Sequence, residues 1–139
     1  MTTVRASDGV WHHICLSWEK TSGSWKIFKD GEVEQEDTNF MTGHTIQKGG
    51  TLVLGQDQDS VGGSFNTEQS FQGMLSYVNV WDRVLLTSQI KEMSQSCLPD
   101  ERYEGNVYKW SDFLRQGGPK LVEPSPCVAF TSLGWWLAN

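Results

Sequence analysis

The pair Asp30-Gly31 lies between two runs of alternating residues, and it constrains the fold more than any other short stretch of this chain. Both central positions of a type I′ turn need a positive φ, which aspartate and glycine tolerate, so the segment SWKIFKDGEVEQE predicts a β-hairpin. The preceding run VWHHICLSW, residues 10–18, is short, aromatic and β-branched, and it predicts another strand. We therefore expect antiparallel strands to dominate the fold.

Later segments extend this pattern. Residues 37–50 are polar and contain three glycines, which predicts a loop. The runs TLVLG at 51–55 and FQGMLSYVNVW at 71–81 predict two more strands, and the second carries bulky side chains on both faces. Such a strand is typical of a sheet that is covered on each side.

One helix is expected at about residues 87–95. Leu86, Ile90 and Met93 recur at helical spacing, and Thr87 or Ser88 can cap the amino terminus. Together these elements predict an all-β fold, an antiparallel sandwich with one appended short helix.

Bulk composition excludes several classes of partner. The chain has 139 residues, a formal net charge of −6 and a mean hydropathy of −0.44, which fits one domain with a modest core. Its negative charge disfavours nucleic acid and anionic membranes as partners. No run reaches the roughly 18 apolar residues of a membrane helix, and residues 1–20 show no secretory signal.

The three cysteines form an odd count. Cys97 and Cys127 bracket a stretch rich in proline and glycine, which a disulfide would close in an oxidising compartment; two free thiols are the alternative. Cys15 lies inside an apolar segment. It is either an inert buried thiol or the partner of a cysteine outside this sequence.

The stretch LGQDQDSVGG, residues 54–63, interleaves carboxylates with amides before a double glycine. If the strand continues through Asp59, Asp57 and Asp59 share one face with Cα atoms roughly 6.7 Å apart, close enough to share an ion. Ca²⁺ binds such hard oxygen ligands. Further oxygens are available from the Gln58 carbonyl and, across the glycine turn, from Asn66, Glu68 and Gln69.

Other interpretations of these residues are weaker. An EF-hand loop would need a side-chain oxygen at Val61 and a preceding helix. A retaining glycosidase would need one carboxyl with a raised pKa, and two aspartates among amides have no evident burial to raise it. A solvated acidic loop without a ligand remains an alternative. His12 and His13 are adjacent in a predicted strand, face opposite ways and cannot chelate one zinc together.

The run WHHICLSWEKTSGSWKIFKDGE, followed by TLVLGQDQDSVGGSFNTEQSFQGMLSYVNVWDRVL, resembles the C-terminal half of a pentraxin domain. The family signature His-x-Cys-x-Ser-Trp is matched by His13, Cys15, Ser17 and Trp18. The resemblance covers residues 8–127, and it also extends to the Cys97 and Cys127 pair, which resembles an extra disulfide in pentraxin modules of larger extracellular proteins.

This resemblance implies a flattened antiparallel jelly roll, similar to concanavalin A-like and laminin G-like domains, that binds ligands through paired calcium ions. It implies that Asp57 and Asp59 bridge both ions, that the Gln58 carbonyl serves the first ion, and that Asn66 and Gln69 serve the second. Pentraxins commonly have Glu at the position of Asp57 and an acidic residue at that of Asn66. The second ion is therefore expected to bind weakly or to be lost.

The resemblance also implies that the domain is incomplete. The resemblance implies a domain of roughly two hundred residues, whose first half supplies further strands, an Asp-Asn pair for the first calcium site and the half-cystine that pairs with Cys15. We expect an N-terminal extension at 1–7, a partial pentraxin domain at 8–127 and an unassigned apolar tail at 128–139. Exposed sheet edges predict poor solubility of the isolated chain.

The sequence thus predicts an extracellular or receptor-ectodomain binding module rather than an enzyme, with calcium as its cofactor. Expected partners are phosphate-bearing or carbohydrate ligands, or extracellular proteins. Pentraxins are often cyclic pentamers, so a homo-oligomer is also expected from the resemblance. The alternative is a structural or adhesive module in which calcium is lost or only rigidifies the loop.

Overall fold

The computed structural model describes residues 3–96, 100–115 and 120–122. In chain order the elements are β1 (Ile14–Trp18), β2 (Trp25–Lys29), β3 (Glu32–Asp37), the 3-10 helix η1 (Thr67–Gln69), α1 (Thr87–Ser94), and the 3-10 helices η2 (Glu101–Tyr103) and η3 (Trp110–Asp112). The chain divides into two compact units. The first is the sheet unit, Met1–Gly43 with Ser76–Asn139, and the second is the loop unit, His44–Leu75.

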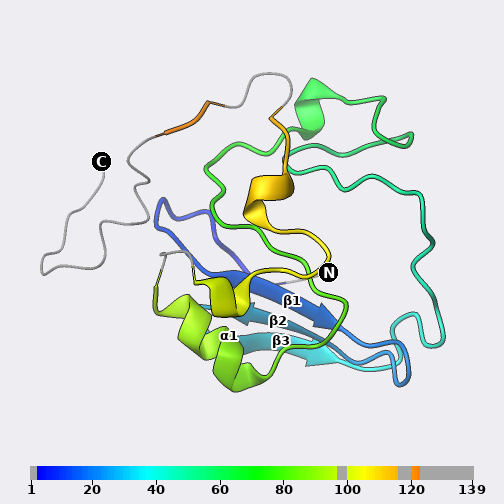
Figure 1. Cartoon of the computed structure of the whole chain (residues 1–139), viewed down its shortest axis with the longest axis vertical. Coiled ribbons are helices and arrows are strands. Elements are labelled where there is room, and N and C mark those ends of the chain that lie inside the picture. Colours follow the sequence, from blue (N-terminus) through cyan, green and yellow to red (C-terminus); the bar gives the residue numbers. More distant parts are fainter. Residues whose placement is uncertain (1–2, 97–99, 116–119, 123–139) are drawn as a thin grey trace, which may run out of the picture. The chain divides into compact units, whose positions relative to one another are not determined.

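The sheet unit is built on three antiparallel strands in the order β1-β2-β3 (Figure 1). The predicted hairpin is confirmed: β2 and β3 pair antiparallel, and they are joined at Asp30, with φ of 53°, and Gly31, with φ of 85°. These left-handed values are the conformation that the Asp-Gly pair tolerates. The hairpin therefore follows from local turn chemistry.

Helix α1 packs against one face of this sheet. The buried core is formed by Phe28 of β2 with Leu85 and Ile90, and Cys15, Trp81 and Met93 pack against it. Because side chains alternate along a strand, Cys15 and Phe28, which lie opposite each other, share the face toward α1. The expected helix is thus confirmed, and Ile90 and Met93 pack against the core as predicted. Leu86, which was expected on the same apolar face, is instead 67% exposed, and Leu85 is buried in its place.

The predicted capping of α1 is wrong. The N-cap residue is Leu86 rather than Thr87 or Ser88, and no side-chain hydrogen bond caps the helix there. Instead, the Gln89 side chain accepts a hydrogen bond from the Leu86 backbone N–H at 3.0 Å. Gln89, one turn into the helix, thus satisfies a backbone donor just outside the helix. The sequence had instead suggested a hydroxyl side chain for the cap.

The strands expected at 51–55 and 71–81 are also wrong. Residues 51–55 form no strand, and within 71–81 the structure has only an isolated bridge from Val80 to Tyr108. Positive φ angles at Gly55, 85°, and Tyr77, 55°, interrupt an extended backbone in each region. The first predicted strand, 10–18, is shortened to β1, because residues 10–13 are held by other contacts described below.

Within the described residues Cys15 forms no disulfide, and its partial burial against the core raises the pKa of its thiol to about 11. This is the behaviour of an inert thiol, since the thiolate is the reactive form. The predicted Cys97–Cys127 disulfide and the apolar tail at 128–139 lie outside the described residues.

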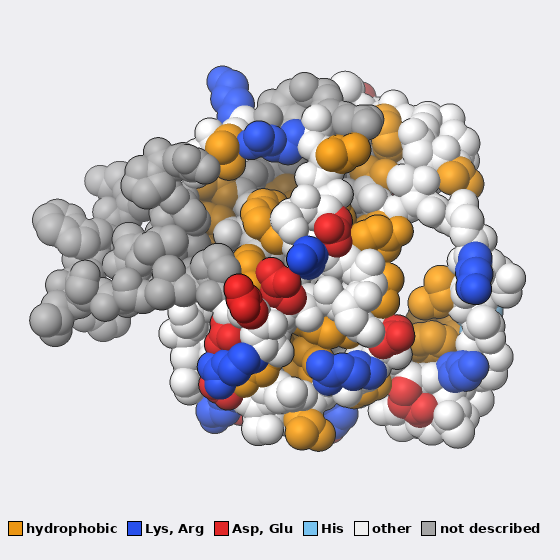
Figure 2. All heavy atoms as spheres, in the orientation of Figure 1, with side chains coloured by type: hydrophobic (Ala, Val, Ile, Leu, Met, Phe, Trp, Pro, Cys, Tyr) orange, Lys and Arg blue, Asp and Glu red, His pale blue; other side chains and the backbone are white. Residues whose placement is uncertain are grey.

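Several large apolar side chains remain exposed in the sheet unit, among them Ile14 (48%) and Leu16 (69%) on β1. Figure 2 shows apolar side chains interspersed with charged ones on one face of the molecule. Within the described residues, no helix is both long enough and apolar enough to cross a membrane.

Candidate oxygen-rich loop site

The loop unit contains two arms that run antiparallel in register. The Phe71 N–H donates to the Gly55 carbonyl at 2.9 Å, and the Gln56 Nε2 donates to the Ser70 Oγ at 2.7 Å. The next pair inward is Asp57 and Gln69, whose Oδ2 and Nε2 atoms are 3.4 Å apart. The arms therefore pair at residues 55/71, 56/70 and 57/69. The last pair brings together two of the predicted ligands, Asp57 and Gln69, which are twelve residues apart in the sequence.

The tip of this loop is folded by the Gln58 side chain. Its Nε2 donates to the Thr51 carbonyl at 2.8 Å, and its Oε1 accepts from the Gly62 N–H at 2.9 Å. Ser60 and Gly63 form a short bridge, with Gly62 at φ of 67°, so the chain reverses at the double glycine as expected. The Gln58 side chain is therefore engaged, which leaves its backbone carbonyl as the ligand that the sequence predicts.

Asn66 caps the return arm. Its Oδ1 accepts from the Glu68 N–H at 3.0 Å, and it is the N-cap of η1. The short helix presents Gln69 at the point where this arm meets Asp57. The Asn66 oxygen is thus used locally, and it would have to exchange a capping bond for a metal bond to act as a ligand.

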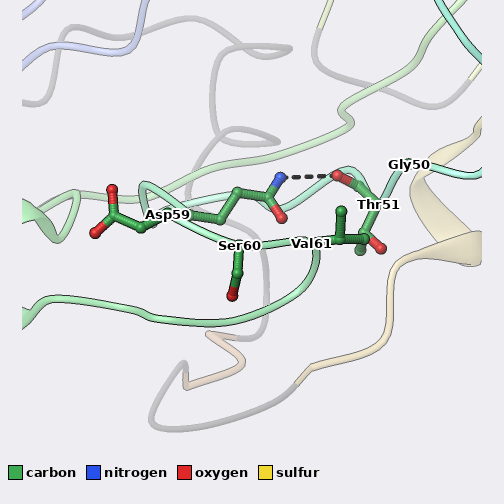
Figure 3. Close-up of a pocket in the computed structure, with 6 residues that line it drawn as sticks. Gly50, Thr51, Asp59, Ser60 and Val61 are labelled. Carbon is green, nitrogen blue, oxygen red and sulfur yellow. Dashed lines mark hydrogen bonds between the residues drawn. The ribbon is translucent and has the colours of Figure 1, made fainter.

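Asp59 lines an open depression of about 350 Å³ together with Gly50, Thr51, Gln58, Ser60 and Val61. Figure 3 shows the Asp59 carboxylate on the side away from Thr51 and Val61. The hydrogen bond to the Thr51 carbonyl is donated by Gln58. The extended strand that was expected to place Asp57 and Asp59 on one face is absent. The relative position of Asp57 and Asp59 is therefore set by the loop contacts and not by strand alternation.

The charges of the loop unit are poorly balanced. It contains three acidic side chains, Asp57, Asp59 and Glu68, and one lysine, Lys48. None of these acids takes part in an ion pair in the portion of the chain that is described. All three are exposed, so water stabilises them at present, and a cation would find unneutralised oxygens here.

The donor chemistry of the loop fits a hard cation. Asp57 and Gln69 already lie side by side, and turning the Gln69 amide would direct its carbonyl oxygen to the same place as the carboxylate. Across the described ranges, however, no group of three or more His, Cys, Asp or Glu side chains is positioned around one point. The loop accordingly offers part of a coordination shell, centred on Asp57.

Sequence reasoning did not single out Gln56. Its Oε1 is buried and receives no hydrogen bond in the described structure, while its Nε2 is held by Ser70. A buried acceptor without a donor is unusual and costly. The alternation of amides and carboxylates in GQDQD indicated that the glutamines here could take part in a site. Nothing in the sequence, however, distinguished Gln56 from Gln58.

The comparisons with known proteins define the class of this chain. A model described as the Pentaxin family matches residues 1–117, which is most of the chain. The chain belongs to the pentraxin family, and its relatives are binding proteins rather than enzymes. The family predicted from the His13-to-Trp18 signature is therefore confirmed.

The relatives include proteins of very different length. The mouse (Mus musculus) protein named Sushi, von Willebrand factor type A, EGF and pentraxin domain-containing protein 1 is 46% identical over 108 residues, covering 78% of this chain and 3% of the relative. Human (Homo sapiens) neuronal pentraxin-2 is 44% identical over 106 residues, covering 76% and 24%. C-reactive protein 1.1 of Limulus polyphemus is 44% identical over 104 residues, covering 73% and 43%.

A solved structure shows the same fold. The native heptameric SAP-like pentraxin from Limulus polyphemus matches with a TM-score of 0.68 and 36% identity, over 78% of this chain and 49% of that one. The chain thus spans less than half the length of these relatives. The part of the pentraxin fold that this chain contains includes the small antiparallel sheet with its helix and the oxygen-rich loop.

Proposed function

We propose that this chain is part of an extracellular pentraxin module that binds ligands in a calcium-dependent manner. Family membership supports the class of function, since calcium is a common cofactor of pentraxins. The observation that carries the proposal in this chain is the in-register pairing of the loop arms, which places Asp57 against Gln69. Asp57 forms no ion pair with any of the described residues. The module would complete an antiparallel jelly roll with sequence beyond residues 8–127.

In this proposal the ligands keep the roles implied by the family. Asp57 and Asp59 supply the negative charge, the Gln58 carbonyl supplies a neutral oxygen, and Asn66 and Gln69 serve a weaker second position. The Gln58 side chain contributes indirectly, because its bonds to Thr51 and Gly62 hold the backbone of the tip. Calcium, when bound, would supply open coordination positions for an oxyanion of a phosphate-bearing or carbohydrate ligand.

One observation favours the alternative of a structural or adhesive module. The Gln58 Oε1 and Asn66 Oδ1 atoms already accept hydrogen bonds that fold the loop. A loop that is organised in this way does not need an ion to keep its shape. In this case recognition of an extracellular partner, or of further copies of the chain, would use the outer surface of the sheet unit and would persist in EDTA.

Calorimetric titration of the chain with calcium tests the proposal. We expect binding with a dissociation constant of about 10⁻⁴ to 10⁻³ M, the range typical of extracellular modules. Asp57→Ala and Asp59→Ala are expected each to weaken binding at least about tenfold, because each removes a charged ligand, while Asn66→Ala is expected to have a smaller effect.

Glu34→Ala is the matched control, since Glu34 is an exposed acid on β3 in the other unit. It should leave calcium binding unchanged. The proposal is overturned if the wild-type chain shows no heat of calcium binding at millimolar calcium, or if Asp57→Ala binds calcium as tightly as the wild type.

A further inference from the structure

A second feature of the chain lies in the sheet unit and concerns its N-terminal residues. We call residues 3–10 the N-terminal strap. The Thr3 N–H donates to the Gln35 Oε1 of β3 at 3.3 Å, and the Lys29 Nζ of β2 donates to the Arg5 carbonyl at 2.8 Å. The strap therefore contacts two strands that lie far from it in sequence.

These contacts place the strap on one particular face of the sheet. Lys29 alternates with Phe28, whose side chain is in the core against α1, so Lys29 projects from the opposite face. Gln35 lies opposite Ile27, which is on that same outer face. The strap is thus held against the outer face, where Ile27 is half-buried and Leu16 is exposed.

The strap is fastened at its other end by His12. The His12 Nε2 lies 2.9 Å from Asp8 Oδ2 and 3.0 Å from Asp8 Oδ1, and its Nδ1 lies 2.7 Å from Asp30 Oδ2. Both ring nitrogens face carboxylate oxygens, which only accept hydrogen bonds. Both nitrogens can donate only when the ring carries two protons and a positive charge.

The partners of His12 are themselves held in place. Asp30 Oδ1 accepts the His13 N–H at 2.9 Å, and the Asp30 N–H donates to the His13 carbonyl at 2.8 Å. Asp8 Oδ1 also accepts the Val10 N–H at 3.1 Å. His12 therefore joins a carboxylate on the strap to one in the turn between β2 and β3.

The charges around His12 favour its protonated form. Hydrogen bonds first to Asp8 and then to Asp30 raise the pKa of His12 above its ordinary value, although burial opposes them. The positive charge of Lys29 also lowers the pKa of Asp30, which favours the carboxylate form that His12 contacts. Burial lowers the pKa of the neighbouring His13, so His13 stays neutral near pH 7 and adds no competing positive charge.

The pKa values of the two carboxyl groups, Asp8 and Asp30, shift in the opposite direction and are lowered. The hydrogen bond from His12 lowers the pKa of Asp8. Burial alone would raise the pKa of Asp30, but the hydrogen bonds from His12 and from the His13 backbone bring it below its ordinary value. Both carboxylates consequently remain charged down to acidic pH.

We propose that Asp8, His12 and Asp30 form a pH-sensitive latch that holds the N-terminal strap against the outer face of the sheet. The latch is closed when His12 carries two protons, and it opens when the ring loses one, because a neutral imidazole donates to only one of the two carboxylates. Asp8 is then released, since Asp30 is fixed by the His13 backbone, and the part of the outer face that the strap contacts, around Lys29 and Gln35, becomes accessible.

The direction of the pH dependence follows from linkage. Because His12 has a higher pKa with the strap bound than released, the latch contributes its full effect below pH about 6.5, the ordinary histidine value, and loses it as pH rises through the raised pKa. On the acidic side the contribution is lost only below the ordinary carboxyl pKa of about 3.9. This device is independent of calcium and of the loop unit.

Limited proteolysis of the full chain tests the latch. Trypsin cleaves after Arg5, which lies within the strap, so the rate at which the peptide ending at Arg5 is released reports strap opening. The rate is measured by mass spectrometry from pH 6 to pH 9 and normalised to cleavage of a free peptide with the strap sequence. We expect about a tenfold rise across this range, the effect of losing one charge-assisted hydrogen bond, with its midpoint at the His12 titration seen by NMR.

Two variants and one control make the test specific. His12→Gln and Asp8→Asn should each give fast cleavage at Arg5 at every pH, while His44→Gln, a change at an exposed histidine of the loop unit, should retain the wild-type profile. Asp8→Asn decides the test if His12→Gln fails to fold, as judged by rapid cleavage after Lys26 in β2. A flat normalised profile for the wild type, or an unchanged profile in Asp8→Asn, overturns the latch.

Discussion

Phe28→Ala is expected to lower the free energy of unfolding of the sheet unit by about 3–5 kcal/mol, which is the usual cost of removing a buried phenylalanine. Phe28 is 2% exposed, and it is one of three buried apolar residues in the described core, with Leu85 and Ile90. A domain of this size has a total stability of about 5–15 kcal/mol. The loss would therefore remove a large fraction of the total stability.

Urea unfolding followed by circular dichroism measures this loss directly. Leu16→Ala is the matched control, because Leu16 lies in the same sheet but is 69% exposed. Its effect should stay within about 0.5 kcal/mol, as for most surface substitutions. Equal unfolding midpoints for the two variants would show that the core lies elsewhere.

Gly31→Ala is expected to destabilise the sheet unit by about 2–5 kcal/mol. The left-handed φ of 85° costs a residue with a side chain about 1–2 kcal/mol. A Cβ atom at Gly31 would also lie 2.5 Å from Ser94 Oγ and 3.0 Å from Lys91 Cα, so α1 would have to move, at a cost of about 1–3 kcal/mol. The hairpin turn therefore needs glycine both for its backbone angle and for the close approach of the helix.

Gly43→Ala separates the two causes. Gly43 has a similar φ of 77°, but a Cβ atom there would meet nothing within 4 Å. Its substitution should show the backbone cost alone, and the difference between the two variants in urea unfolding should report the contact with α1. If both variants lose the same stability, α1 does not pack on the turn in solution.

The parts of the fold that depend on local chemistry could be predicted from the sequence. The Asp30-Gly31 turn needs only two residues with the right backbone preference, and the helical spacing of Ile90 and Met93 was enough to locate α1. The strands expected at 51–55 and 71–81 failed, because a strand requires a backbone partner and periodicity does not supply one. Apolar runs alone therefore predict more strands than the described structure contains.

The candidate site was predicted in composition but not in arrangement. The oxygen donors of the loop were recognised from the GQDQD pattern, and the structure brings Asp57 and Gln69 together. The pairing of the two arms depends on the Gln56–Ser70 contact, a side-chain pair fourteen residues apart that no local pattern specifies. Likewise, only the folded arrangement of Asp8, His12 and Asp30 reveals the latch.

Amide hydrogen exchange is the most direct test of the central claim, that the oxygen-rich loop of this pentraxin module takes up calcium. Exchange is measured on the full chain in millimolar calcium and in EDTA. The account predicts slower exchange with calcium in residues 55–71 and unchanged exchange in β1, β2 and β3. Identical exchange of residues 55–71 in the two solutions would contradict it.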